Sequence, residues 1–531
     1  MTSRLARVVV WVRERRGLLA LLGLALGLRL PLLGAVPNPT GDEGNWAWYA
    51  HSILRGRPVT LPPDARFVSL AFARLLTLAY RLLGVSYGSA RLVPVVAVLL
   101  AMVFAWRSLR RAGHPDAALA VAALVAVHPW SVLWSRTVTV PYALAFGLAL
   151  AGPLAVYALV TRRERPWGLV PALQLCALGL HFTPLAALPA LATGLWVLAS
   201  SERRRAVAHP ALAVGLLLAL AHPLWLARGA LGAAQAFSRP PLGAYFTLLP
   251  ARLEVFARAL LGGLGGEATV RHFTGEVLPW PAECALLAAV ALALAAALRV
   301  GTLLARFAAL QLAVATVGLP LLLAPARTWN LPGVDAERYV FAVLAPAVLL
   351  LGALAERPRG RSLVALVALV ASVQTARVAL GLLGGCGPDR GAFTLAGGGG
   401  YRGWKVPRER RAVAALVREE ALRQARGEPV TVLVADHAFH PLHMLNADGG
   451  PPTVDVAKFP LPRAPGRLHL FVLWSPGVFA PGYLPAEDLA HQRSLEALLH
   501  GPRFTQPRAV RALTQADGAP LVTLWTARAR E

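Results

Sequence analysis

Lysine and cysteine are scarce in this chain, and charge of either sign is sparse. Among 531 residues there are three cysteines and two lysines, Lys405 and Lys458, and charged residues make up 15% of the sequence. Three cysteines cannot form a disulfide framework. Soluble domains contain about 25% charged residues, whereas this chain has a mean hydropathy of +0.55. Long apolar runs of the kind that cross a bilayer must account for the difference.

The positive charge comes almost entirely from arginine, and its placement argues against a nucleic-acid partner. The formal net charge is +26, but short arginine clusters alternate with apolar runs, as the positive-inside bias requires at the cytoplasmic ends of membrane spans. The six clusters are Arg13, Arg15 and Arg16; Arg107, Arg110 and Arg111; Arg162, Arg163 and Arg165; Arg203, Arg204 and Arg205; Arg299 and Arg306; and Arg357, Arg359 and Arg361.

If all six clusters are cytoplasmic, an even number of crossings must separate each neighbouring pair. The apolar runs satisfy this rule with eleven spans, so we predict a mainly α-helical, polytopic membrane bundle with a cytoplasmic N-terminus. The spans are expected near 17–36, 89–106, 116–133, 139–160, 167–182, 184–200, 208–228, 280–298, 305–324, 338–355 and 362–384.

Two outer loops are predicted to carry helices outside the spans. In residues 66–84, three arginines together with Ser69 and Thr77 fall within one arc of a helix, which indicates an amphipathic helix lying in the membrane interface. Another helix is expected near 250–262.

The part of the chain after the last span differs in kind. We predict a transmembrane domain over 1–384 and a small extracytoplasmic α/β domain over 385–531. A helical pattern covers 407–426 and begins with proline. Strand-like runs follow at 430–435, 468–474 and 521–526.

An acidic pair follows the first span. Asp42 and Glu43 precede Trp46, Trp48 and Tyr49. A carboxylate at the membrane surface suits a general base acting on a hydroxyl group, and neighbouring aromatic rings suit contact with a sugar. The alternative is a pair of solvated carboxylates beside an interfacial aromatic belt.

Arginines also recur at the outer ends of spans, where the charge bias disfavours them. These are Arg91, Arg136, Arg327 and Arg338. A lipid phosphate at this surface would need such groups, because guanidinium binds phosphate in a bidentate manner. The alternative is that each one reaches the headgroups or pairs with a loop carboxylate. Arg29, within the first span, is expected to face the bundle interior.

The histidines predict no metal site. His181 is expected to be a packed residue at a span end, and His437, His440 and His443 lack the further ligands that a zinc site needs. No cofactor is indicated, although a divalent metal stays an open alternative.

Four short motifs resemble those of the C-type glycosyltransferase superfamily, in particular the protein O-mannosyltransferase and aminoarabinose transferase group. They are the Arg-containing first span followed by Asp42–Glu43; the turn GVSYGSARL containing Arg91; Pro129 followed by Ser135–Arg136; and Arg338–Tyr339. In layout the resemblance covers roughly residues 15–384.

The resemblance implies a bacterial inner-membrane enzyme that takes a sugar from a polyprenyl-phosphate donor on the extracytoplasmic face. It implies that Asp42, with Glu43 beside it, acts as the base. The donor phosphate would be held by Arg338, Arg136, Arg327 and Arg91, and sugar or acceptor contacts would come from Trp46, Tyr49 and Tyr339. The acceptor stays open among protein, lipid and polysaccharide.

One stretch departs from the family pattern. Some relatives carry an acidic residue shortly after the Ser-Arg pair, but this chain reads TVTVPY there, which puts a two-carboxylate or metal-bridged arrangement in doubt. Two other classes stay as alternatives: a transporter or flippase of lipid-linked intermediates, and a non-catalytic envelope assembly protein. A transporter would be expected to show repeats and polar residues near the bilayer midplane, and neither is evident.

Overall fold

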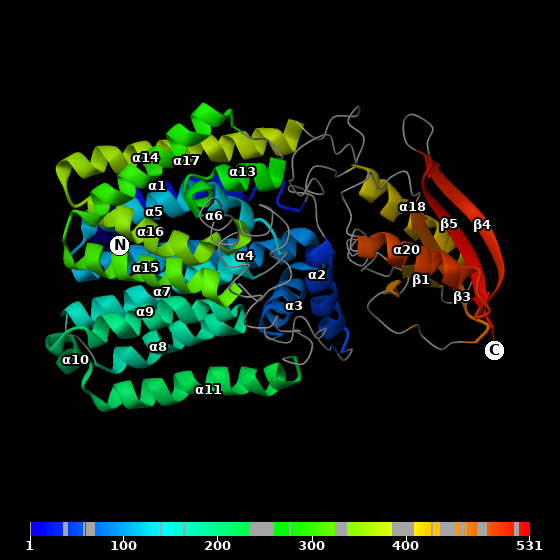
Figure 1. Cartoon of the computed structure of the whole chain (residues 1–531), viewed down its shortest axis with the longest axis horizontal. Coiled ribbons are helices and arrows are strands. Elements are labelled where there is room, and N and C mark those ends of the chain that lie inside the picture. Colours follow the sequence, from blue (N-terminus) through cyan, green and yellow to red (C-terminus); the bar gives the residue numbers. More distant parts are fainter. Residues whose placement is uncertain are drawn as a thin grey trace, which may run out of the picture.

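A computed structural model describes most of the chain as a helical bundle followed by a small sheet domain (Figure 1). Every structural statement below concerns the described residues, which are 2–34, 41–56, 59, 70–138, 141–162, 166–233, 260–274, 278–323, 337–384, 408–425, 428, 430–435, 453–456, 461, 465–474, 486–514 and 520–530.

Each of the eleven predicted spans coincides with a helix of the bundle. These helices are α1 (Thr2–Arg29), α4 (Tyr87–Ala112), α5 (Pro115–Val127), α7 (Tyr142–Arg162), α8 (Leu169–Leu178), α9 (Ala187–Leu198), α11 (Pro210–Ala233), α14 (Trp280–Leu298), α15 (Leu303–Leu323), α16 (Phe341–Leu354) and α17 (Pro358–Gly384). They lie side by side with their long axes nearly aligned (Figure 1).

The helices of the bundle differ in length, and not all of them are long enough to span a bilayer as a single helix. Five of those described, α4, α7, α14, α15 and α17, are long and apolar enough to cross a membrane unaided. The pair Pro184–Leu198 and Ser201–Val207, the latter being α10, passes the same test together but is bent by 111°. Shorter apolar helices cover Pro115–Val127, Pro210–Leu224 and Phe341–Leu354.

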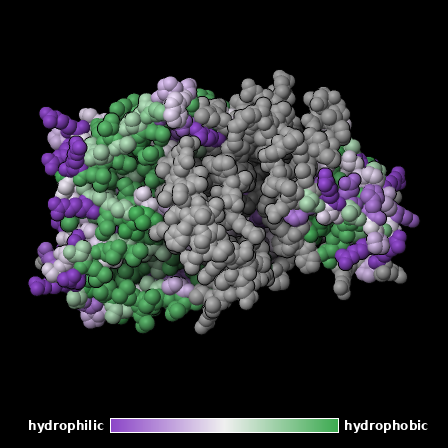
Figure 2. Space-filling model, viewed as in Figure 1, coloured by the Kyte–Doolittle hydropathy of each residue, from purple (hydrophilic) through white to green (hydrophobic). Residues whose placement is uncertain are grey.

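The flank of the bundle is apolar. Large side chains such as Leu217, Leu292 and Leu380 are exposed by about 70%, which would be a liability in water but matches a lipid solvent. Figure 2 shows apolar side chains along the visible flank and hydrophilic ones gathered at the end of the bundle where α10 lies.

The basic turns that the sequence assigns to one side do meet in space. Arg361 forms an ion pair with Asp116 at 2.6 Å, and Arg357 donates to the carbonyl of Val300 at 3.4 Å. Three turns far apart in sequence therefore lie at the same end of the bundle, as an even number of crossings between them requires.

A hairpin of two helices follows the first span. It consists of α2 (Gly41–Leu54) and α3 (Ala71–Leu83), which lie beyond the other end of the bundle (Figure 1). The arginines of α3 are on its exposed side together with Leu78 and Leu82, as expected for an interfacial helix. The prediction that Thr77 lies on the polar face was wrong: Thr77 is buried between the two helices, where its hydroxyl lies within donating distance of the carbonyls of Ala73 at 2.8 Å and Ala50 at 3.0 Å.

The second outer loop is described only in part. Residues 250–259 of the helix expected near 250–262 lie outside the described residues, whereas residues 260–264 are helical and lead into α13 (Glu267–Thr274).

The C-terminal region forms a five-stranded sheet in the order β2-β1-β3-β5-β4. Strands β1 (Thr431–Val434), β2 (Thr453–Asp455) and β3 (Leu468–Trp474) pair in parallel, and β5 (Pro520–Ala529) pairs antiparallel with β3 and with β4 (Phe504–Thr514). The predicted α/β class is confirmed.

The sheet is covered on both faces by helices, because its strands alternate apolar side chains between the two faces. Val432 and Leu470 pack with α18 (Arg408–Ala425), whereas Leu433 and Phe471 pack with α20 (Ala486–Leu499). These two cores share no member with the core of the bundle.

The buried His469 of β3 predicts acid sensitivity of this sheet. Burial lowers the pKa of His469 below its ordinary value of 6.5, against the weaker opposing effect of the Arg467 carbonyl, to which Nδ1 donates at 3.0 Å. An unfolded histidine titrates near 6.5. As pH falls below that value the unfolded chain therefore binds a proton that the folded sheet resists, and stability falls.

We expect His469→Gln to lose stability less steeply than the parent between pH 7 and pH 5. The measurement is hydrogen exchange of the β3 amides in the full chain. His500→Gln, at an exposed position, is the control and should follow the parent. Parallel pH profiles of parent and His469→Gln would contradict the assignment.

Candidate functional site

A fully buried ion pair connects the first outer hairpin to the bundle. Glu43 of α2 and Arg91 of α4 are each 0% exposed, and the guanidinium donates through Nε at 3.0 Å to Oε1 and through Nη2 at 2.6 Å to Oε2. Such a bidentate arrangement is among the strongest that side chains make. It fixes the start of α2 against the start of α4.

The same two side chains also hold the backbone of two further segments. Oε1 of Glu43 accepts from the amide of Val138 at 2.6 Å, and Nη1 of Arg91 donates to the carbonyl of Leu33 at 2.9 Å. The end of the first span and the segment after Ser135–Arg136 therefore meet at this pair. The alternative stated for Arg91, that it pairs with a loop carboxylate, is the one the structure shows, although the sequence did not identify Glu43 as the partner.

A helix break lies beside this pair. The residue before a proline is biased toward extended backbone, and here α5 ends at Val127 and α6 (Pro129–Trp134) begins after an extended His128. His128 Nδ1 accepts from the amide of Trp130 at 3.2 Å and Nε2 lies 3.1 Å from the carbonyl of Leu264, to which it can donate.

The break exposes carbonyls that lipid cannot satisfy, and side chains from distant helices donate to them. Arg29 donates through Nη2 to Val125 and through Nη1 to Ala126, each at 2.9 Å, and Thr375 of α17 donates to Val127 at 2.6 Å. Arg29 is fully buried, as predicted. Its guanidinium also donates to the hydroxyls of Ser131 and Ser135 at 3.0 and 3.1 Å.

Arg136, which follows α6, donates in turn to backbone carbonyls at the end of α1. Nη1 donates to the carbonyls of Leu28 and Arg29 at 2.9 Å, and Nη2 donates to that of Pro31 at 2.6 Å. Arginine at a helix C-terminus is favourable because it neutralises the negative end of the helix dipole. The structure thus places Arg136, expected to bind phosphate, in a capping position.

The aromatic residues of the outer hairpin are packed. Trp46 and Tyr49 are 7% and 4% exposed, and the Trp46 ring contacts the ring of Phe72 of α3 at 5.2 Å between centroids. Tyr339 is half-buried in η6 (Glu337–Val340), with its ring 5.5 Å from that of Tyr142. Of the three predicted sugar contacts, Tyr339 is the least buried.

One tyrosine beside the pair is held neutral. Burial in α3, and next the charge of Glu43, raise the pKa of the Tyr80 phenol well above its ordinary value of 10. Tyr80 therefore stays protonated at neutral pH and is no candidate for a base.

Other predicted residues are only partly placed. Asp42 lies in the first turn of α2 and Arg338 lies in η6, but their side chains are outside the described residues, as are all of Arg327, His437, His440 and His443. His181 is half-buried and its Nε2 lies 2.6 Å from Nδ1 of His222. In the part of the chain that is described, no three His, Cys, Asp or Glu side chains could hold a metal ion.

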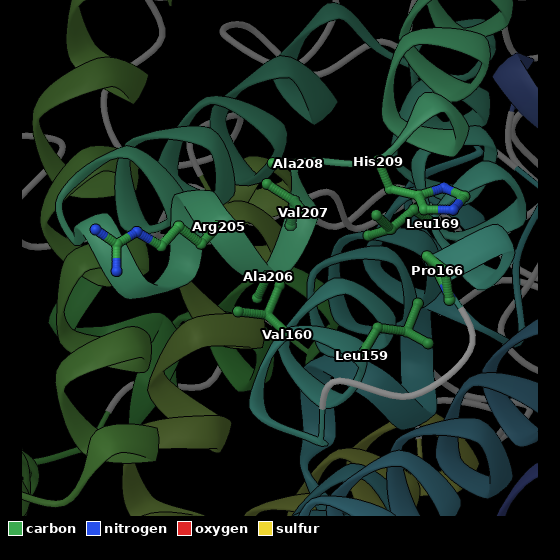
Figure 3. Close-up of a pocket in the computed structure, with 9 residues that line it drawn as sticks. All are labelled: Leu159, Val160, Pro166, Leu169, Arg205, Ala206, Val207, Ala208 and His209. Carbon is green, nitrogen blue, oxygen red and sulfur yellow. The ribbon is translucent and has the colours of Figure 1, made fainter.

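A pocket of about 200 Å³ lies away from these residues. It is formed at the end of α7, the start of α8, the end of α10 and the two residues after it, with apolar walls that include Leu159, Leu169 and Val207 (Figure 3). The labelled Arg205 side chain points away from the other lining residues. None of the candidate site residues lines this pocket.

Comparison with known proteins supports the fold. Residues 68–226 match the dolichyl-phosphate-mannose-protein mannosyltransferase family. The chain is similar to ArnT from Cupriavidus metallidurans bound to undecaprenyl phosphate, with a TM-score of 0.54 and 14% identity over 96% of this chain and 98% of that one. No protein of curated function matches the chain by sequence.

A weaker likeness is to the archaeal oligosaccharyltransferase AglB from Archaeoglobus fulgidus in complex with an inhibitory peptide and a dolichol-phosphate. Its TM-score is 0.46 with 14% identity, over 84% of this chain and 65% of that one. The family match and the ArnT likeness confirm the predicted resemblance to the C-type glycosyltransferases, and the fold is that of a polytopic membrane protein of this kind.

Because the Glu43–Arg91 pair is buried, we expect removal of one partner to cost more stability than removal of both charges. Arg91→Met leaves the Glu43 carboxylate buried without its partner, which should cost about 3–5 kcal/mol. Glu43→Gln combined with Arg91→Met should recover part of this loss, because no charge remains buried and Gln can still accept from the Val138 amide.

Thermal unfolding of the purified protein in detergent measures this effect. The control is Asp116→Asn, which breaks an ion pair whose side chains are 57% and 40% exposed and should cost less than about 1 kcal/mol. Equal losses in Arg91→Met and Asp116→Asn would refute the structural role of the buried pair.

Proposed function

We propose that this protein is a membrane glycosyltransferase that moves a sugar from a polyprenyl-phosphate donor to an acceptor on the extracytoplasmic face. The family match and the fold support the reaction class. The donor class is supported by the undecaprenyl phosphate bound to the similar ArnT structure. The observation that carries the proposal is the Glu43–Arg91 pair, because it holds Asp42 at the outer end of the bundle.

Asp42 is the proposed catalytic base. Both carboxylate oxygens of Glu43 are already bound, to Arg91 and to the Val138 amide, and the side chain is fully buried. An acceptor hydroxyl cannot reach such a group. Of the predicted acidic pair, Asp42 therefore takes the base role and Glu43 positions it.

Arg338 is the proposed principal ligand of the donor phosphate, with Arg327 as a second. Arg91 donates through Nε, Nη1 and Nη2 to groups within the protein, and Arg136 does so through Nη1 and Nη2. Neutralising charge on the departing phosphate is the main electrostatic contribution expected of an arginine here. Tyr339, next in sequence, would contact the sugar or the acceptor.

The proposed orientation places the N-terminus in the cytoplasm and the sheet domain outside. The turns that Arg357 and Arg361 connect lie at the α10 end of the bundle, and the positive-inside bias assigns that end to the cytoplasm, which supports this orientation. The α2–α3 hairpin and the sheet domain both lie toward the opposite end (Figure 1). We propose the bacterial inner membrane as the location.

Asp42→Asn should abolish sugar transfer, because the amide cannot accept the proton of the acceptor hydroxyl, while leaving insertion and thermal stability unchanged. The measurement is transfer of a radiolabelled sugar from lipid-linked donor to acceptor in membranes that contain the variant. Asp116→Asn, at the other end of the bundle, serves as the charge-matched control. Full transfer by Asp42→Asn would remove the base assignment.

Donor binding gives an independent test. A ligand that binds only the folded state stabilises it by about 2.7 kcal/mol at a hundred times its Kd. We expect polyprenyl-phosphate sugars to raise the Tm of the parent protein in detergent, nucleotide sugars to leave it unchanged, and Arg338→Ala to lose the shift. No shift with any lipid-linked donor would favour the transporter or assembly-protein alternative.

A further inference from the structure

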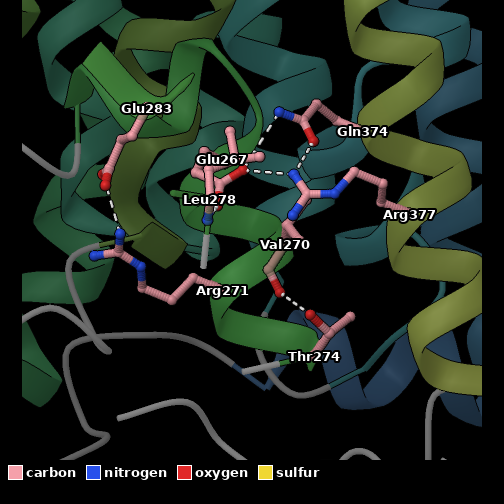
Figure 4. A network of polar contacts seen from close by, with 8 residues as sticks. All are labelled: Glu267, Val270, Arg271, Thr274, Leu278, Glu283, Gln374 and Arg377. Atoms are coloured by element: carbon pink, nitrogen blue, oxygen red, sulfur yellow. Dashed lines mark hydrogen bonds and ion pairs between the residues drawn. The ribbon is translucent and has the colours of Figure 1, made fainter. Parts of the chain in front are cut away.

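The described part of the second outer loop is anchored by a buried carboxylate. Glu267 begins α13 and is 1% exposed. Its Oε1 accepts from the amide of Leu278 at 2.9 Å, which closes the loop on itself, and its Oε2 accepts from Nη1 of Arg377 at 2.8 Å and from the amide of Gln374 at 3.4 Å (Figure 4).

Arg377 and Gln374 come from the last span, α17, and they also bind each other. Nη1 of Arg377 donates to Oε1 of Gln374 at 2.7 Å. The carboxylate of Glu267 is thus held by a backbone amide, a side-chain amide and a guanidinium. Because two of these donors lie on α17 and the third lies just before α14, the carboxylate fixes the start of α13 to α17.

A second ion pair on α13 provides a natural comparison. Arg271 donates to Glu283 of α14 at 3.0 Å, but these side chains are 38% and 19% exposed (Figure 4). Water competes for such a pair, so it contributes little. The two pairs therefore differ chiefly in burial, while both connect α13 to a neighbouring span.

The anchored segment packs directly on the elements that carry the proposed site. A Cβ on Gly266, whose φ is +83°, would lie 2.5 Å from the Pro129 ring at the helix break, and the Phe273 ring lies 5.6 Å from that of Trp134 in α6. A Cβ on Gly263 would lie 2.6 Å from both methyl groups of Val340 in η6. This segment therefore packs tightly against both the helix break and η6.

We propose that Glu267 is a positioning residue for the donor site: by fixing α13 it sets the place of η6 and hence of Arg338. This inference rests on the proposed function, since it takes Arg338 as the ligand of the donor phosphate. A guanidinium must lie within about 0.5 Å of its productive position to be effective. Loss of the anchor should therefore weaken donor use before it affects acceptor use.

The test compares the KM for a polyprenyl-phosphate sugar, the KM for the acceptor and kcat among single variants. We expect Glu267→Gln and Arg377→Met to raise the donor KM about tenfold, with the acceptor KM and kcat at saturating donor within about twofold of the parent. Glu283→Gln, the matched control, should leave all three within about twofold. Arg377→Lys, which retains the charge, should restore most of the donor affinity.

The outcomes separate this inference from the proposed function. A raised donor KM in Arg338→Ala with parental values in Glu267→Gln and Arg377→Met overturns the positioning role and leaves the donor site standing. A fall in kcat at an unchanged donor KM overturns it as well. Parental kinetics in Arg338→Ala would remove the donor-site assignment and this inference with it. If Glu267→Gln does not fold, Arg377→Met, at a 25% exposed position, decides the same question.

Discussion

Backbone carbonyls freed inside a bilayer must find donors within the protein, and this constraint organises the bundle around Pro129. Lipid offers no hydrogen bonds, so an unsatisfied carbonyl costs several kcal/mol there. The break between α5 and α6 frees the carbonyls of Val125, Ala126 and Val127, and α1 and α17 supply the donors. A kink in one span thereby fixes the first and last spans to it.

Two of the arginines predicted to bind phosphate, Arg91 and Arg136, hold parts of the bundle together. Arg91 neutralises Glu43, and Arg136 caps α1, so both guanidinium groups donate to partners within the protein. Their value to a reaction is indirect, because they hold the α2 hairpin and the Ser135–Arg136 corner in register. An arginine whose hydrogen bonds are made within the protein stabilises the fold, whereas an arginine that binds a substrate must keep donors free for it.

Periodicity and charge bias predicted the bundle well, because both depend on local sequence. All eleven helices and three of the five strands lie where the apolar patterns placed them. Strand β2 has only three residues, and β4 alternates poorly, with register shifts and mostly exposed side chains. Neither carries the apolar pattern of a buried strand. The helix α20 has a weak apolar pattern, and among its described side chains Leu495 and Leu499 are the ones fully buried in this core.

The site was predicted less completely, because its partners are distant in sequence. Spacing brought Glu43 and Arg91 to one region but could not show that they form a pair 48 positions apart. Glu267 and Arg377, 110 positions apart, were missed. An arginine near the outer end of the last span runs against the charge bias, as Arg91 and Arg136 do, and the same reasoning would have selected Arg377.

Arg29 has a consequence for how the chain is assembled. Its guanidinium resides in the first span, yet the carbonyl it binds on Ala126 is made 97 positions later. At about 5–20 residues per second of synthesis, the first helix waits roughly 5–20 s before its charge can be neutralised by hydrogen bonds within the bundle. During that time a cation in hydrocarbon is costly, so the helix must rest near the interface or against the insertion machinery. Membrane integration of the N-terminal span is thereby coupled to emergence of α5 and α6 from the ribosome.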